Sequence, residues 1–146
     1  MSFPILLVDD DPLLAEVLIE AAKINFPEAR FQQVYSAGEA KRYIDQLEGY
    51  GPKLILLDIN LNEMNTGFNL LAYIQVHPQA RLVPVLMLTV SQLTNDVKLA
   101  YEIGASSFTV KPFSYEDWQT YLVNLRHYWY KTVSLPSIQF SPSTTR

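Results

Sequence analysis

The chain contains no cysteine, and its basic residues form no extended cluster. Without thiols, disulfides, a cysteine-based zinc site and thiol catalysis are excluded. Eleven Lys and Arg residues against fifteen Asp and Glu residues leave a net charge of -4, and apart from the pair Lys41 and Arg42 the basic residues are scattered. This distribution disfavours a nucleic-acid-binding surface, so we expect no nucleic-acid partner.

The N-terminus lacks the features of an export signal. No basic segment precedes its first apolar stretch, and Asp9 interrupts that stretch after four residues. We therefore expect no signal peptide, no membrane span and a cytoplasmic location. The 146 residues, 49% hydrophobic and 18% charged, predict one globular domain with a sizeable core.

Short apolar segments alternate with helical patterns along the whole chain. The segments that predict buried strands are 5–8, 54–57, 83–88 and 108–110, and 30–35 is a more polar candidate for an edge strand. Helical spacing predicts helices over 12–25, 36 to about 49, 67–76, 95–103 and 114 to about 129. Five strands alternating with five helices predict an α/β fold, a parallel sheet covered on both faces.

Polar residues and glycine mark the expected ends of these helices. Asp11 is the expected N-cap of the first helix, with Pro12 in its first turn. Ser36 followed by Glu39 predicts a capping box, Gly104 a helix end and Ser114 another N-cap. We divide the chain into a domain, 1–131, and a Ser-, Thr- and Pro-rich C-terminal extension, 132–146, whose last six residues we expect to be disordered.

Polar side chains follow four of the predicted strands, where ligands bind in open parallel sheets. They are Asp9 and Asp10, Asp58, Thr89 and Lys111. Taken singly, each has an ordinary structural role as a turn, strand or surface residue. Together they predict that three carboxylates, a hydroxyl and an ammonium meet at one edge of the sheet.

Such a cluster of acids needs a compensating charge. One helix cap needs one carboxylate, so a cap at Asp11 leaves Asp9 and Asp10 unexplained. A hard divalent cation such as Mg²⁺ takes oxygen ligands and would compensate them. With Mg²⁺ present, Asp58 is placed to attack phosphorus, while Lys111 neutralises charge on the phosphoryl oxygens. The expected product is an aspartyl phosphate.

Four segments together resemble the response-regulator receiver domains of two-component signalling, the CheY-like family. They are "LLVDDDP", "LILLDINL", "VPVLMLTV" and "GASSFTVKPF", and with the residues between them they cover roughly 4–130. The resemblance implies a flavodoxin-like, doubly wound sheet of five parallel strands in the order 2-1-3-4-5, with five helices.

The resemblance also implies a metal-dependent phosphoacceptor. Asp10 and Asp58 would bind Mg²⁺ through their side chains and Asn60 through its backbone carbonyl, while Asp9 would support the metal and its waters. Asp58 would accept the phosphoryl group from a sensor histidine kinase or a phosphotransfer protein.

The family's signalling switch and lysine also have counterparts in this chain. Thr89 and Lys111 would bind the phosphoryl group, and Thr89 and Phe108 would move together as the switch. The Lys111–Pro112 bond would be the family's cis peptide.

The chain departs from the family in the loop after Asp58 and at the residue after Thr89. Asn62 stands where the family usually has a proline, and Gly67 lies nine rather than eight residues after Asp58, so the loop is one residue longer. Val90 follows Thr89 where the family prefers a small residue. We expect these changes to affect loop conformation and access to the site, and to leave the acceptor in place.

Aromatic residues are concentrated in the last helix and just after it. Some would pack on the sheet, and the remainder predict an interface, because the chain ends too soon for an output domain. Trp129 and the following "VSLP" resemble a subgroup of single-domain regulators that partner bacterial phytochrome kinases, in which this region joins two subunits. We therefore expect a homodimer and output through protein–protein contacts. The aromatic residues are Tyr115, Trp118, Tyr121, Tyr128, Trp129 and Tyr130.

Two other functions remain as alternatives to a phosphorylated signalling protein that is not an enzyme. A degenerate receiver would act as a binding module without phosphorylation, but no member of the acidic set is missing. A phosphatase of the haloacid-dehalogenase type needs a second Asp two residues after the nucleophile, where this chain has Asn60. His77 and His127 lack metal-ligand spacing and are expected to be structural.

Overall fold

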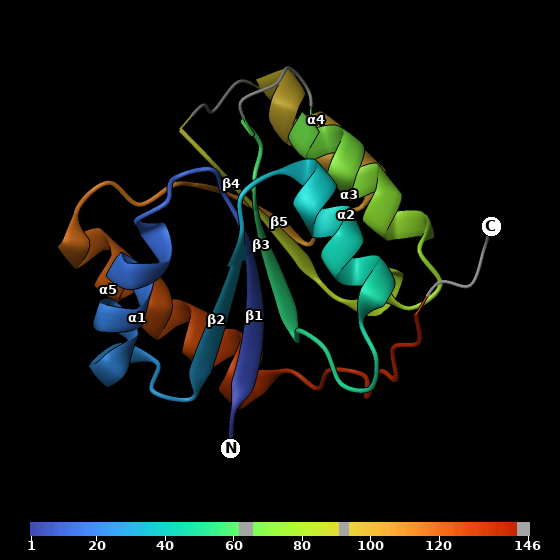
Figure 1. Ribbon diagram of the computed structural model, residues 1–146. Helices are drawn as coiled ribbons and strands as arrows, with labels where there is room; N and C mark the ends of the chain where they lie inside the picture. Colours follow the sequence, from blue (N-terminus) through green and yellow to red (C-terminus); the bar gives the residue numbers. More distant parts are fainter. Residues whose placement is uncertain (62–65, 91–93, 143–146) are drawn as a thin grey trace.

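The computed structural model describes residues 1–61, 66–90 and 94–142, and places all named strands in one parallel sheet (Figure 1). The strand order is β2-β1-β3-β4-β5, which confirms the predicted doubly wound arrangement. The chain goes from β1 to β2 at one edge, then crosses back to β3 on the other side of β1 and continues to β5 at the opposite edge. The direction of strand addition therefore reverses between β1 and β3. The strands are β1 (Phe3–Val8), β2 (Ala29–Val34), β3 (Leu54–Asp58), β4 (Val85–Thr89) and β5 (Ser107–Val110).

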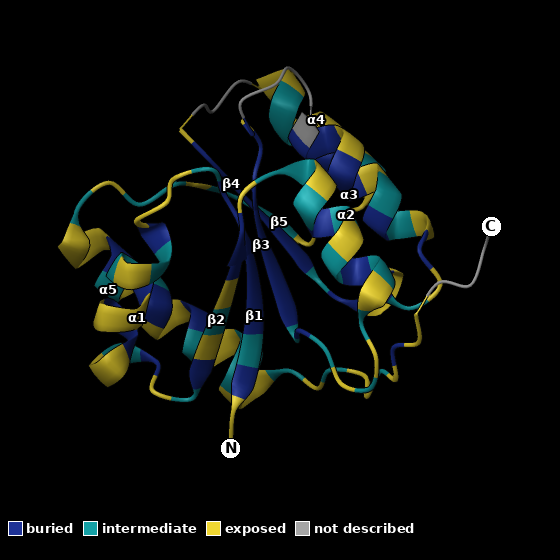
Figure 2. Ribbon diagram, in the orientation of Figure 1, coloured by how far each residue is buried: buried dark blue, intermediate teal, exposed yellow. Residues whose placement is uncertain are grey.

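Helices cover both faces of this sheet. Figure 1 shows α1 (Leu14–Asn25) and α5 (Tyr115–Leu125) on one side, with α2 (Ala37–Gln46), α3 (Thr66–Val76) and α4 (Thr94–Ile103) on the other. Alternate residues of β1 enter the two cores, since Leu7 packs in the cluster with α1 and α5, and Leu6 in the cluster on the opposite face. The central strands are buried on both faces (Figure 2), so polar side chains gather at the strand ends instead.

Helix α1 begins later than predicted, because the chain first makes a turn. The Leu14 N–H donates to the Asp11 carbonyl at 3.3 Å, with Pro12 and Leu13 between them. Leu13 has φ -101° and ψ -3°, which suits the third residue of a type I turn, where Pro is favoured at the second. The Asp11 carboxylate accepts from the Leu13 N–H at 3.0 Å. Asp11 therefore shapes the turn, and the N-cap position belongs to Leu13.

The other predicted helix starts are confirmed. Ser36 accepts from the Glu39 N–H at 3.1 Å, and Ser114 accepts from the Asp117 N–H at 3.0 Å. Helix α2 ends at Gln46, three residues before Gly49, and Gly104 follows α4 with φ +133°, which favours glycine. The Nδ1 atom of His77 accepts from the N–H groups of Gln79 and Ala80, a structural role that agrees with the prediction for His77.

The C-terminal extension packs against the domain. After α5 the chain continues through a π-helical turn, Arg126–Thr132, and then runs along the edge of the sheet opposite the strand C-termini (Figure 1). Phe140 is only 4% exposed and forms an antiparallel bridge with Gly49, with N–H to carbonyl distances of 2.7 and 2.8 Å. A side chain on Gly51 would collide with the Phe140 ring, since its Cβ would lie 2.6 Å from Cε1.

We expected the last six residues, 141–146, to be disordered. Of these, the structure describes 141–142, and 143–146 lie outside the described residues. Within the described part of the chain, no helix has the length and apolar character needed to cross a membrane.

The start of the π-helical turn is joined to the loop after α1 by an ion pair. Arg126 Nε and Nη2 donate to the two carboxylate oxygens of Glu28 at 2.7 and 2.8 Å. This bidentate contact lowers the pKa of Glu28 from 4.5 to about 2. The neighbouring rings of Phe3, Phe26 and Tyr130 pack together with centroid distances of 5.5 to 5.9 Å.

Replacing Phe140 by Ala should destabilise the domain, because the ring fills a buried site beside Gly51. We expect the free energy of unfolding to fall by about 3 kcal/mol, the low end for a buried Phe, since a chain end relaxes into the space. Urea unfolding measures this change. The control is Ser141→Ala, at an exposed neighbour, and an unchanged midpoint for Phe140→Ala would show that the extension contributes no stability.

The Glu28–Arg126 pair should make stability depend on pH in the acid range. The pKa of Glu28 is lower in the folded chain, so the stabilisation is complete above about pH 4.5 and is lost as the pH falls toward 2. The difference in unfolding free energy between wild type and Glu28→Gln should therefore be larger at pH 7 than at pH 3. Glu102→Gln, at an exposed glutamate of α4, is the control. An equal Glu28→Gln effect at both pH values would contradict this assignment.

Candidate functional site

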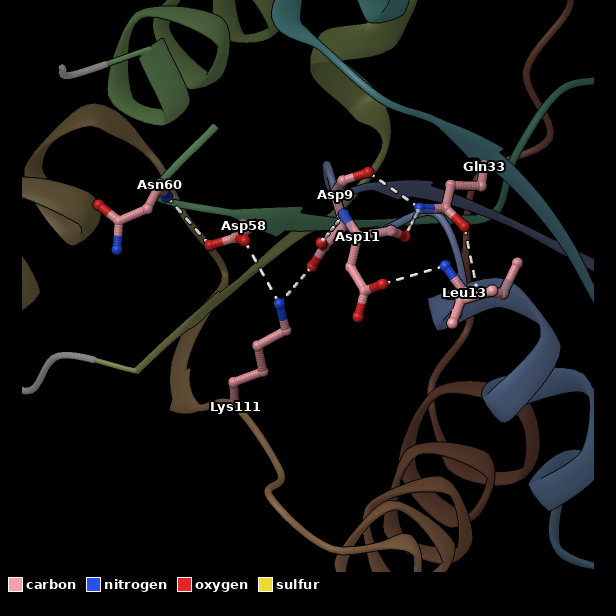
Figure 3. A network of polar contacts seen from close by, with 8 residues as sticks. Asp9, Asp11, Leu13, Gln33, Asp58, Asn60 and Lys111 are labelled. Carbon is pink, nitrogen blue, oxygen red and sulfur yellow. Dashed lines mark hydrogen bonds and ion pairs between the residues drawn. The ribbon is translucent and has the colours of Figure 1, made fainter. Parts of the chain in front are cut away.

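Asp9, Asp58 and Lys111, three of the side chains predicted to converge at the C-terminal edge of the sheet, meet there (Figure 3). Carboxylate oxygens of Asp9, Asp10 and Asp58 lie within 4.8 Å of one another. Asp9 and Asp58 are buried, and Asp10 is half-buried. Thr89 is buried at the C-terminal end of β4, the strand that neighbours β3. The apolar strands leave this edge as the place where polar groups can be packed together.

Lys111 bridges two of the acids. Its Nζ atom lies 2.5 Å from Asp9 Oδ2 and 3.3 Å from Asp58 Oδ2 (Figure 3). The side chain reaches the acids from the loop after β5, whose start is held by the Lys111 N–H donating to the Thr89 carbonyl at 2.7 Å. One ammonium faces three carboxylates, so the cluster keeps an excess of negative charge if all are ionised.

The prediction of a cis bond before Pro112 is wrong for this structure. Among the described residues no peptide bond is cis, so Lys111–Pro112 is trans. The trans form is intrinsically favoured even before proline, by about 0.5–1 kcal/mol. In this form the chain already brings the Lys111 ammonium to Asp9 and Asp58.

Backbone donors orient the two buried carboxylates. Asp58 Oδ1 accepts from the Asn60 N–H at 3.0 Å, and Asp9 Oδ1 accepts from the Asp11 N–H at 2.9 Å. The Asn60 side chain points away from Asp58 (Figure 3) and is exposed. Asn60 therefore contributes its backbone to this region, and metal binding through its carbonyl stays a prediction.

Burial and the neighbouring charged groups both shift the pKa values of Asp58 and Lys111. Burial raises the pKa of Asp58, while the Asn60 N–H and the charge of Lys111 oppose that rise and Asp9 adds to it. For Lys111, burial favours the neutral amine, but the hydrogen bond to Asp9 and the charges of both acids outweigh it and raise its pKa. The ammonium is therefore firmly charged, whereas an ionised Asp58 is costly.

The donor set fits a hard divalent cation. Three carboxylates from two strand ends offer the oxygen ligands that Mg²⁺ and similar ions take. Burial is the main cause of the raised pKa of Asp58, and repulsion from Asp9 adds to it; a bound cation would offset that repulsion. Cation binding would therefore explain why Asp9, Asp10 and Asp58 lie together despite their mutual repulsion.

The two residues expected to form the switch lie on neighbouring strands, β4 and β5. Thr89 lies at the C-terminal end of β4, and Phe108 on β5 is half-buried against the core that contains α3 and α4. The side chain of Val90 is 78% exposed, so in this structure it points to solvent rather than filling the core.

The longer loop after Asp58 is only partly described, since Asn62 lies outside the described residues. Gly67 shows why a glycine is needed at its far end. A Cβ there would lie 2.5 Å from the Ile59 carbonyl oxygen and 2.8 Å from that of Asp58. The start of α3 therefore packs directly on the backbone that carries Asp58.

One residue at the site was missed by the sequence analysis. Gln33, on β2, is buried and hydrogen-bonds the loop that carries Asp9 and Asp11. The only signal in the sequence was that Gln33 stands next to Val34 in a predicted strand. Because that strand was predicted to be a polar edge strand, a glutamine in it was not a reason to expect a functional role.

The chain matches the family model described as the response regulator receiver domain over residues 5–122. It is 30% identical over 131 residues to the probable methanogenesis regulatory protein FilR2 of Methanothrix harundinacea, covering 87% of this chain and 83% of FilR2. It is 28% identical over 137 residues to response regulator Rcp1 of Synechocystis sp., covering 91% of this chain and 92% of Rcp1.

Solved structures of response regulators have the same fold as this chain. The phosphorylated cyanobacterial phytochrome response regulator RcpA superposes with a TM-score of 0.82 at 26% identity, covering 94% of this chain and 100% of RcpA. The Mn²⁺-bound form of Rcp1 superposes with a TM-score of 0.78 at 28% identity, covering 92% and 99%. A divalent cation is therefore compatible with this fold in a relative.

Divalent cations should stabilise this chain through the acidic cluster. A cation that binds only the folded state adds about 2.7 kcal/mol at 100 times its dissociation constant. We expect Mg²⁺ or Mn²⁺ to raise the melting temperature of the wild type and not that of Asp10→Asn. Asp11→Asn is the matched control, because Asp11 lies outside the cluster and should keep the rise. A wild type indifferent to both ions would contradict the metal site.

Proposed function

The chain belongs to the family of response regulator receiver domains, and on that basis we propose that Asp58 accepts a phosphoryl group from the phosphohistidine of a sensor histidine kinase or phosphotransfer protein. The observation that carries the proposal is the position of Asp58 at the end of β3, grouped with Asp9 and Asp10 and 3.3 Å from the Lys111 ammonium. This combination supplies a nucleophile, a place for a cation and a fixed positive charge at one edge.

The transfer is a displacement at phosphorus. An oxygen of Asp58 forms the new P–O bond as the P–N bond to histidine breaks, and the histidine nitrogen leaves with the bonding electrons. The Asn60 N–H holds the carboxylate in place at 3.0 Å. Lys111 then balances charge on the phosphoryl oxygens, and Thr89 hydrogen-bonds one of them.

Mg²⁺ would be held by the side chains of Asp10 and Asp58 and by the backbone carbonyl of Asn60. Both carboxylate oxygens of Asp9 already have partners, the Asp11 N–H and the Lys111 ammonium. Asp9 therefore suits the supporting role better than that of a direct ligand. When bound, the ion neutralises charge that develops on the phosphoryl oxygens.

The same residues argue against the rival functions. An enzyme of the haloacid-dehalogenase type needs a general acid at position 60, and the Asn60 side chain points away from Asp58 (Figure 3). A degenerate receiver would have no reason to keep three mutually repelling acids beside Lys111. We therefore propose a cytoplasmic signalling protein that modifies only its own Asp58.

Output is proposed to pass through protein contacts. Movement of Thr89 and Phe108 would alter the protein surface near β4 and β5, the strands that carry them. On α5, Trp118, Leu122 and Leu125 are buried, whereas Tyr115 and Val123 are exposed, as is Tyr128 in the turn that follows. We assign a homodimer contact to this last helix and the extension, 132–146, beyond the receiver domain, 1–131. The likeness to RcpA favours a phytochrome-type sensor kinase as the donor.

The intact mass of the full chain after incubation with acetyl phosphate tests this function. We expect one phosphoryl adduct that requires Mg²⁺, is lost in Asp58→Asn and is kept in Asp117→Asn, at an exposed acid of α5. Sizing the same samples shows whether phosphorylation makes or breaks a dimer. Absence of both an adduct and beryllofluoride binding would instead favour the binding module.

A further inference from the structure

Gln33 is a buried amide beneath the acidic loop. It lies on the edge strand β2 beside Leu7 of β1 and is 8% exposed, while its neighbour Gln32 is exposed. Its side chain points toward the loop between β1 and α1 (Figure 3). Burying an amide costs free energy unless its N–H donors and its oxygen are hydrogen-bonded. The hydrogen-bond partners of Gln33 therefore indicate its role.

Its hydrogen-bond partners are backbone groups of that loop and of the start of α1. Gln33 Nε2 donates to the Asp9 carbonyl at 2.9 Å and to the Asp11 carbonyl at 2.8 Å. Gln33 Oε1 accepts from the Ala15 N–H at 3.1 Å. The amide orientation is unambiguous, because the flipped amide would place its oxygen against two carbonyl oxygens.

These contacts lie on both sides of Asp10. The Asp9 carbonyl belongs to the peptide group that precedes Asp10, and the Asp11 carbonyl precedes Pro12, which has no N–H. The Ala15 N–H is an early donor of α1, one of the groups that a helix start leaves without an intrahelical acceptor. Gln33 therefore fixes the loop before and after Asp10 and also where it joins the helix.

An amide is the side chain that this loop requires. The loop presents two acceptors and one donor to the same point, and only an amide offers two N–H donors and a carbonyl oxygen together. A lysine there has no acceptor for Ala15, and a carboxylate has no donor for the carbonyls. The amide also binds the acidic loop without adding a further charge to the buried pair of Asp9 and Asp58 beside Lys111.

We propose that Gln33 is a positioning residue of the metal site, which holds the loop so that the carboxylates of Asp9 and Asp10 meet that of Asp58. It acts through the backbone, since its hydrogen bonds reach main-chain groups of Asp9, Asp11 and Ala15. The inference rests on the proposed function in one respect, that the cluster binds a divalent cation. Outer partners that orient metal ligands typically account for 10- to 100-fold in affinity.

The test is the dissociation constant of Mn²⁺, followed by electron paramagnetic resonance on the full chain, with Mg²⁺ as competitor. Gln33→Met keeps the length of the side chain and removes its hydrogen bonds, and should weaken Mn²⁺ binding about 10- to 100-fold. Gln32→Met, at the exposed neighbour, should bind Mn²⁺ as the wild type does. Gln33→Glu keeps an acceptor for Ala15 but lacks both donors, so it should also bind weakly.

Hydrogen exchange separates positioning from general stability. In metal-free Gln33→Met the amides of the β1–α1 loop and first turn of α1 should exchange faster, while those of β3 and β4 keep wild-type protection. If Gln33→Met fails to fold, the same measurements on Gln33→Glu decide. Wild-type Mn²⁺ affinity in a folded Gln33 variant would overturn this inference alone. A wild type that binds no Mn²⁺ would overturn the proposed metal function, and this inference with it.

Discussion

The contact of the Lys111 ammonium with Asp9 and Asp58 is the interaction on which the site depends. It joins the ends of β1 and β3 to the loop after β5, so three separate parts of the chain meet at one charge. Buried carboxylates are tolerated only when paired and hydrogen-bonded. Here each buried acid has one backbone donor as well as the ammonium, which leaves the remaining negative charge for a cation.

The fold explains why these charges lie where they do. A parallel sheet covered on both faces has no room for polar side chains along its central strands, whose residues are buried apolar groups. The strand ends are the first positions where carboxylates can gain backbone donors, an ammonium and access to solvent. The opposite edge carries no such cluster among the described residues, and there Phe140 of the extension packs on Gly51 instead.

The acidic loop is supported from outside itself. Asp11 and Pro12 shape a turn before α1, and Gln33 on the neighbouring strand supplies the hydrogen bonds that this turn cannot make alone. Under the proposed positioning role of Gln33, the affinity of the site for a cation would depend on an uncharged residue of the edge strand β2. Changes at that edge would then alter metal binding while Asp9, Asp10 and Asp58 stay the same.

The sequence by itself determined the fold class and the members of the acidic cluster. Alternating apolar strands and amphipathic helices leave few arrangements, and in a parallel sheet every strand end lies on one edge, so Asp9, Asp58 and Lys111 could be brought together without coordinates. The tertiary structure alone decided the contacts of Gln33, the turn at Asp11 and the docking of Phe140 on Gly51. The Gln33 contacts and the docking of Phe140 depend on pairing between segments far apart in the chain, which local spacing does not encode. The turn at Asp11 is local, but Asp residues favour both helix caps and turns, so spacing alone did not distinguish them.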